Sequence, residues 1–115
     1  MSKQFERRMR VMRSRDGATA EEGFHDLLDH IDEHVGDLIA EFHAELAKAE
    51  PDHAMTSWML ELIGESRSER ALPTLVEQLY SLDETLSRWA VRGLEKLDTR
   101  EARTELSPSS RRPRR

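Results

Sequence analysis

Two histidines and two carboxylates stand at helical spacing in the acidic part of this chain. His30 and His34 are four residues apart, Asp26 lies one turn before them, and Asp37 follows His34 by three residues. Imidazole and carboxylate groups spaced in this way on one helix can share a zinc or nickel ion. However, the surrounding residues are those of the solvated face of an amphipathic helix, and the HExxH signature is missing. We therefore predict no metal site.

The residue types needed for covalent catalysis are also missing. The sequence has no cysteine, which excludes thiolate nucleophiles, disulfides and cysteine-ligated metals. No serine is framed by glycines as in a nucleophile elbow, and no glycine-rich loop could hold a phosphate group. We predict that the protein is not an enzyme and that it uses no cofactor.

The carboxylates point instead to recognition of a basic partner. Residues 16–52 carry twelve acidic side chains and one basic, whereas residues 1–15 carry six basic and one acidic, and residues 107–115 carry four arginines. An acidic surface attracts basic proteins and raises the rate of encounter with them. The residues that we predict to bind such a partner share one acidic helical region: Asp26, Asp29, Asp32, Glu33, Asp37, Glu41 and Glu45.

An amphipathic helical pattern positions these side chains. Apolar residues recur every three or four positions over residues 24–46, which is typical of helix. Thr19 is the predicted N-cap of this helical region. We expect a break at Gly36–Asp37, because residues 37–42 (DLIAEF) align with residues 74–79 (TLVEQL). That alignment makes residues 37–48 a separate inner helix of a degenerate repeat.

The C-terminal half contains a repeat of 31 residues. The segment WMLELIGESRSERALPTL, which begins at Trp58, aligns without a gap on WAVRGLEKLDTREARTEL, which begins at Trp89; Ala71 then matches Ala102. A fixed period of this length indicates stacked helical hairpins that bury their apolar faces against each other. The two tryptophans are expected in the core or at the seam between repeats.

These patterns predict an all-α fold. The expected architecture is a short right-handed α-solenoid of about three antiparallel helical hairpins over residues 19–106, followed by a disordered arginine-rich tail over residues 107–115. Residues 1–18 leave three alternatives open: a frayed, partly ordered terminus, a basic amphipathic helix that contacts a membrane, nucleic acid or protein, or a segment lying against the acidic body. The apolar residues at helical spacing in this segment bury little area, which favours the frayed terminus.

The segment ALPTLVEQLYSLDETLSRWAVRGLEKL, beginning at Ala71, resembles a HEAT-type repeat of the short bacterial variety related to phycobilin-lyase repeats. Val91 and Gly93 stand where alanine is more usual in that family. The resemblance implies a helical scaffold for protein contacts, and small acidic proteins with such repeats are also similar to immunity proteins of toxin systems. The positions that carry the resemblance are Ala71, Pro73, Leu75, Asp83, Arg88, Ala90 and Leu94.

The sequence therefore favours a non-catalytic protein-interaction module that binds a basic partner, with an immunity or regulatory role. A nuclease toxin would be such a partner, because its substrate channel must be cationic. The alternative is a nucleic-acid-associated protein acting through Lys3–Arg15 and Arg111–Arg115, although residues 16–106 carry 22 acidic and only 8 basic side chains. No apolar run approaches the roughly 20 residues of a membrane span and no signal peptide is evident, so we expect a cytoplasmic protein.

Overall fold

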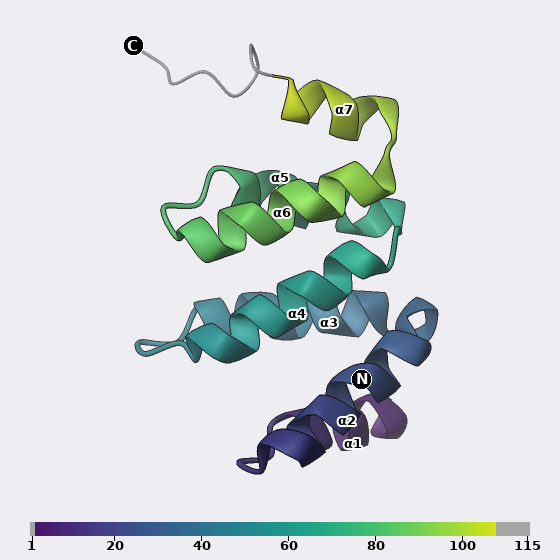
Figure 1. The fold of residues 1–115 in the computed structure, drawn as a ribbon, viewed down its shortest axis with the longest axis vertical. Coiled ribbons are helices and arrows are strands. Elements are labelled where there is room, and N and C mark those ends of the chain that lie inside the picture. The colour runs from purple at the N-terminus through teal and green to yellow at the C-terminus, as the bar shows by residue number, and fades with distance from the viewer. Residues whose placement is uncertain (1, 108–115) are drawn as a thin grey trace.

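A computed structural model describes residues 2–107, and in this range the chain forms seven α-helices, one short 3₁₀ helix and no strand (Figure 1). The predicted all-α fold class is confirmed. No helix within the described range is long and apolar enough to cross a membrane. The elements in chain order are α1 (Lys3–Met12), α2 (Gly17–Asp29), α3 (Ile31–Leu46), α4 (His53–Glu65), the 3₁₀ helix η1 (Glu69–Ala71), α5 (Leu72–Leu79), α6 (Glu84–Leu97) and α7 (Arg100–Leu106).

Neighbouring helices pack in pairs, α1 on α2, α3 on α4 and α5 on α6. The pairs are joined mainly through α4, which packs on α6 and to a lesser degree on α2, and α7 covers α6 and α5. Along the 44 Å long axis, the α1–α2 pair lies at one end and α7 at the other (Figure 1). The turns within the pairs lie along one edge of the molecule, and the connections between pairs lie along the opposite edge.

The helix boundaries differ from the sequence prediction in the acidic region. Asp16, not Thr19, caps α2: its carboxylate accepts hydrogen bonds from the Thr19 backbone N–H at 3.1 Å and from the Thr19 hydroxyl at 2.6 Å. The Asp16 carboxylate accepts both hydrogen bonds at once, so Asp16 is the N-cap and Thr19 is the third residue of the helix. The helix is then interrupted at His30, which has φ −119° and ψ 24°, between the end of α2 and the start of α3.

The predicted break at Gly36–Asp37 is wrong, because α3 runs through both residues without interruption. The glycine serves a packing role instead. A Cβ atom at Gly36 would lie 2.3 Å from a guanidinium nitrogen of Arg70, so the missing side chain gives the arginine of η1 room to lie over this helix.

The N-terminal segment also differs from the expectation of a frayed terminus. It forms α1, capped by the Ser2 hydroxyl, and its apolar residues Phe5, Met9 and Met12 are buried. The helix lies against the acidic body, as the third interpretation of this segment proposed. The buried apolar area is small, and ion pairs between arginines at α1 and carboxylates of α2 and α3 add to the stabilisation. Apart from Ser107, the tail predicted to be disordered lies outside the described residues.

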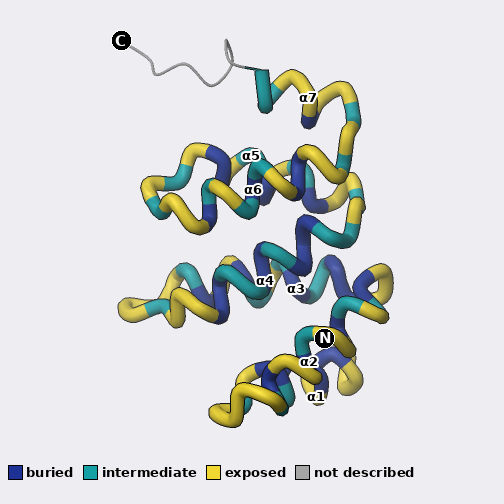
Figure 2. The backbone as a smooth tube through the Cα atoms, in the orientation of Figure 1, coloured by how far each residue is buried: buried dark blue, intermediate teal, exposed yellow. Residues whose placement is uncertain are grey.

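A single apolar core runs through the stack of helices (Figure 2). The two alanines matched by the 31-residue repeat, Ala71 and Ala102, are both buried. Trp58 and Trp89 are partly buried and pack against the edge of the core, which places them at the seams between helix pairs. Trp58 contacts Phe24 of α2, with 5.3 Å between the ring centroids.

Candidate functional site

The seven carboxylates predicted to bind a partner do not form one exposed face, because two arginines at α1 neutralise part of the set. Arg8 is buried and its Nε donates to an Asp26 oxygen at 3.2 Å. Arg13, the residue after α1, contacts Glu41 at 3.1 Å and Glu45 at 3.3 Å. These contacts hold α1 across α2 and α3, and they remove three of the predicted residues from the pool of unpaired charge.

Glu45 is the clearest exception to the predicted surface, since it is only 3% exposed. One of its oxygens accepts from the Asp52 backbone N–H at 3.0 Å, and the other accepts from Lys48 at 2.9 Å and from Arg13. These bonds fasten the α3–α4 loop to the end of α3. The backbone hydrogen bond from Asp52, with that from Lys48, lowers the pKa of Glu45 to about 2. Glu45 is therefore a structural carboxylate, and its assignment to an exposed binding face was wrong.

Three of the predicted residues do form an exposed acidic cluster where α2 meets α3. Asp29 ends α2, and Asp32 and Glu33 stand in the first turn of α3. All three are exposed, and none forms an ion pair with a described residue. We call these three residues the junction carboxylates. The place of Asp32 and Glu33 in the first turn of α3 is favourable because an N-terminal helix end attracts negative charge. Asp37, one turn farther on, is half-buried.

His34 is buried against α1. The Arg8 guanidinium donates to His34 Nε2 at 2.7 Å, and the ring packs on Phe5 at 5.4 Å between centroids. Burial, followed by the nearby Arg8 charge, lowers the pKa of His34. Because arginine can only donate, Nε2 must be unprotonated here, and a metal ion at this atom would have to displace the guanidinium.

His30 makes a separate set of contacts at the α2–α3 junction. Its Nδ1 lies 3.0 Å from the main-chain oxygen of Asp26. Within the described range no group of three or more histidine, aspartate and glutamate residues is arranged to hold a metal ion. The two histidines therefore have separate structural surroundings: His34 packs against α1, and His30 lies at the α2–α3 junction.

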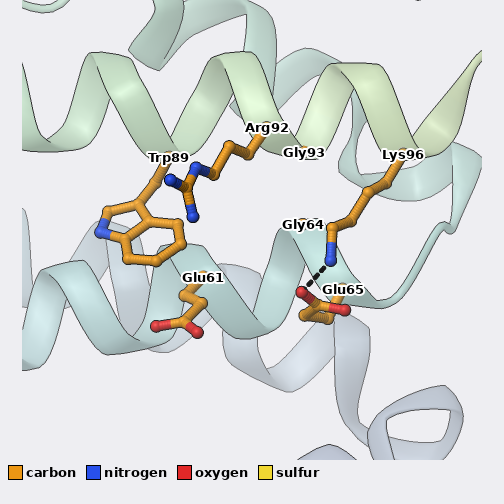
Figure 3. A pocket seen from close by; sticks show the side chains of 7 residues that line it. All are labelled: Glu61, Gly64, Glu65, Trp89, Arg92, Gly93 and Lys96. Atoms are coloured by element: carbon orange, nitrogen blue, oxygen red, sulfur yellow. Dashed lines mark hydrogen bonds and ion pairs between the residues drawn. The ribbon is translucent and has the colours of Figure 1, made fainter.

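A small groove follows the seam between α4 and α6 (Figure 3). Its volume is about 90 Å³. The Arg92 guanidinium lies 5.1 Å from the centroid of the Trp89 ring, and Lys96 forms an ion pair with Glu65 across the groove. Burial and the neighbouring Glu65 raise the pKa of Glu61, which is a property shared by catalytic carboxyl groups.

Glu61 faces charged and aromatic side chains of α6 across the groove. The groove lining contains no serine, threonine or histidine that Glu61 could activate as a nucleophile. The two helices approach closely at Gly64 and Gly93, where a Cβ on Gly64 would lie 2.9 Å from the Gly93 Cα. The geometry is that of a tightly packed helix seam with charged side chains along its rim.

The residues that sequence reasoning missed are Arg8 and Arg13. Arg8 precedes the buried Met9 and Arg13 follows the buried Met12. Each arginine therefore lies at the border of the apolar face of α1 and reaches carboxylates of α2 or α3. No family model matches the chain, and neither a curated protein nor a solved structure is detectably similar to it. The function must therefore be inferred from the surface itself.

Proposed function

We propose that this chain is a non-catalytic, cytoplasmic protein of the HEAT-like repeat type that binds a basic protein through the junction carboxylates Asp29, Asp32 and Glu33. Its stacked helix pairs act as a short right-handed α-solenoid that presents this cluster. The concrete form of the proposal is an immunity or regulatory protein whose partner has a cationic surface, such as the substrate channel of a nuclease toxin.

The observation that carries the proposal is the contrast within the acidic set. Asp26, Glu41 and Glu45 are paired with arginines at α1, whereas the junction carboxylates are exposed without an ion pair to any described residue. Unpaired surface charge of one sign raises association rates and selects partners of the opposite sign.

Nucleic-acid binding through the basic termini has less support. Two of the six basic residues in the N-terminal segment, Arg8 and Arg13, are paired with carboxylates of the same chain. The arginines at Arg111–Arg115 lie outside the described residues. The folded body between the two segments carries a large excess of acidic residues, which repel phosphates.

The proposal is tested by replacing Asp29, Asp32 and Glu33 with lysine. The partner is first isolated by affinity purification of the tagged wild-type chain and identified by mass spectrometry, and its affinity for each variant is then measured with purified proteins. We expect the triple variant to bind at least about 100-fold more weakly, because both the attraction and the steering are reversed. A matched control replaces three exposed glutamates on other elements, Glu69, Glu95 and Glu101, with lysine.

If the two triple variants lost the same affinity for the partner, the junction carboxylates would not be the binding site, because the partner would be responding to net charge alone. The nucleic-acid alternative predicts a salt-steep affinity for DNA or RNA. Because α1 is part of the core, that alternative is tested by replacing the exposed Arg7, Arg10 and Arg15 with glutamine and removing residues 108–115, which leaves the buried contacts of α1 in place.

A further inference from the structure

Large apolar side chains are left exposed at one place in the described part of the chain, the α5–α6 loop. Leu82 is fully exposed and Tyr80 is 53% exposed. The loop is held firmly, because the Asp83 N–H donates to the Ser81 hydroxyl at 3.0 Å and the Asp83 carboxylate caps α6. Leu82 is thus presented to solvent by an ordered turn.

An apolar hollow lies between the α1–α2 turn and the start of α4. It has a volume of about 310 Å³, at the lower end of the range for pockets that bury a ligand. Methionine side chains adapt to the shape of an apolar occupant. The rim includes Arg13 and Arg15, and Arg15 is exposed without an ion pair to a described residue. The apolar lining consists of Met12, Ala20, Ala54, Met55 and Trp58.

The exposed loop and the hollow lie on the same edge of the molecule. The turns within the three helix pairs all face this edge (Figure 1). His53, the first residue of α4, lies beside the α5–α6 loop, with its Nδ1 3.9 Å from an Asp83 oxygen. The α2–α3 connection, which the junction carboxylates flank, lies along the opposite edge. A contact through this edge therefore leaves them open.

We propose that this edge is a self-association surface, in which two copies related by a two-fold axis each insert Leu82 into the hollow of the other, while Tyr80 stays bonded to Glu105 of its own chain. The charges are complementary in this arrangement. Glu84 follows the loop, and Arg15 on the rim of the hollow has no ion pair with a described residue. The other charged rim residues are already engaged within the chain, Arg13 with Glu41 and Glu45, and Asp52 as the cap of α4. A two-fold axis matches each loop with the partner's hollow, so both contacts form at once and the assembly closes at two copies.

The contact is small. Interfaces below about 1,200 Å² of total buried surface are typical of transient association, so we expect a dissociation constant on the order of 10 to 100 μM. Sedimentation equilibrium of the purified full chain over a concentration range that spans this value measures the association directly.

Leu82→Asp should weaken the dimer at least about 100-fold, because both copies lose their central apolar contact. Arg15→Glu should weaken it by about 10-fold through charge repulsion, and the double variant Arg15→Glu/Glu84→Arg should restore it. Arg100→Glu, an exposed charge reversal at the first residue of α7, is the matched control and should leave association unchanged, because the α6–α7 connection lies along the opposite edge. Thermal unfolding of each variant checks that the fold is retained, as expected for exposed positions.

A wild-type chain that stays monomeric throughout the concentration range overturns the proposal. A dimer that persists in Leu82→Asp also overturns it, since the contact would then lie elsewhere. Neither result bears on partner binding at the junction carboxylates, because those residues are unchanged in every variant of this series.

Discussion

Replacing Glu45 with glutamine should destabilise the protein strongly while leaving its surface nearly unchanged. In the fold the pKa of Glu45 is lowered from 4.5 to about 2, chiefly by the backbone hydrogen bond from Asp52 and the bond from Lys48. Each tenfold change in proton affinity corresponds to about 1.4 kcal/mol, so the ionised carboxylate contributes about 3 kcal/mol to the free energy of unfolding. Glutamine keeps the shape and one acceptor oxygen, and the expected loss is therefore about 2 to 3 kcal/mol.

The sign of the pH dependence follows from the lowered pKa. Because the unfolded chain binds the proton more tightly than the folded one, this stabilisation is complete above pH 4.5 and is lost as the pH falls toward 2. Urea unfolding followed by circular dichroism measures it. At neutral pH the Glu45→Gln midpoint should lie on the order of 1 to 2 M below that of the wild type. The gap should close as the solution is acidified.

Glu41→Gln is the matched control, because Glu41 is more exposed and shares the Arg13 partner. Exposed ion pairs contribute less than about 1 kcal/mol, so this variant should be close to the wild type. The reasoning about Glu45 is refuted if both variants lose the same stability at neutral pH. It is also refuted if the difference between Glu45→Gln and the wild type is independent of pH.

Two further predictions concern the packing of α1. Gly23→Ala should cost at least about 2 kcal/mol of unfolding free energy, because a Cβ there would lie 2.4 Å from the Met12 backbone nitrogen, whereas Gly17→Ala, with nothing within 4 Å, should cost little in the same urea assay. His34→Gln keeps an acceptor for Arg8 but does not titrate. Since the pKa of His34 is lowered in the fold, wild-type stability should decline as the pH falls below about 6.5, and this part of the decline should be absent from the variant.

The helical class could be predicted because its signal is local. Apolar residues at helical spacing specify a buried face whatever the helix packs against, and the matched Ala71 and Ala102 are both buried. The capping signal is also local, yet the sequence pattern predicts Thr19 as the cap whereas the structure has Asp16. Both are good N-cap types, and only the hydrogen-bond geometry separates them.

The arrangement of charges could not be predicted because it depends on contacts between distant residues. Arg13 and Glu45 are 32 residues apart in sequence, and nothing in either local pattern indicates that they meet. The same applies to Gly36, which looks like a helix breaker in isolation and is instead the point where Arg70 approaches α3. Of the seven predicted residues, only Asp29, Asp32 and Glu33 are both exposed and free of an ion pair with a described residue, since the exposed Asp26 is paired with Arg8.

The order of the helix pairs along the long axis sets where the molecule opens first. Among the described elements α7 is short, buries Ala102 fully, and packs mainly on α6. Opening of α7 therefore breaks few contacts and leaves α1, α2 and α3 intact. In hydrogen exchange, the amides of α7 should exchange well before those of α3. The acidic junction thus stays rigid while the far end of the chain fluctuates, so partner binding is expected to add little protection to α7.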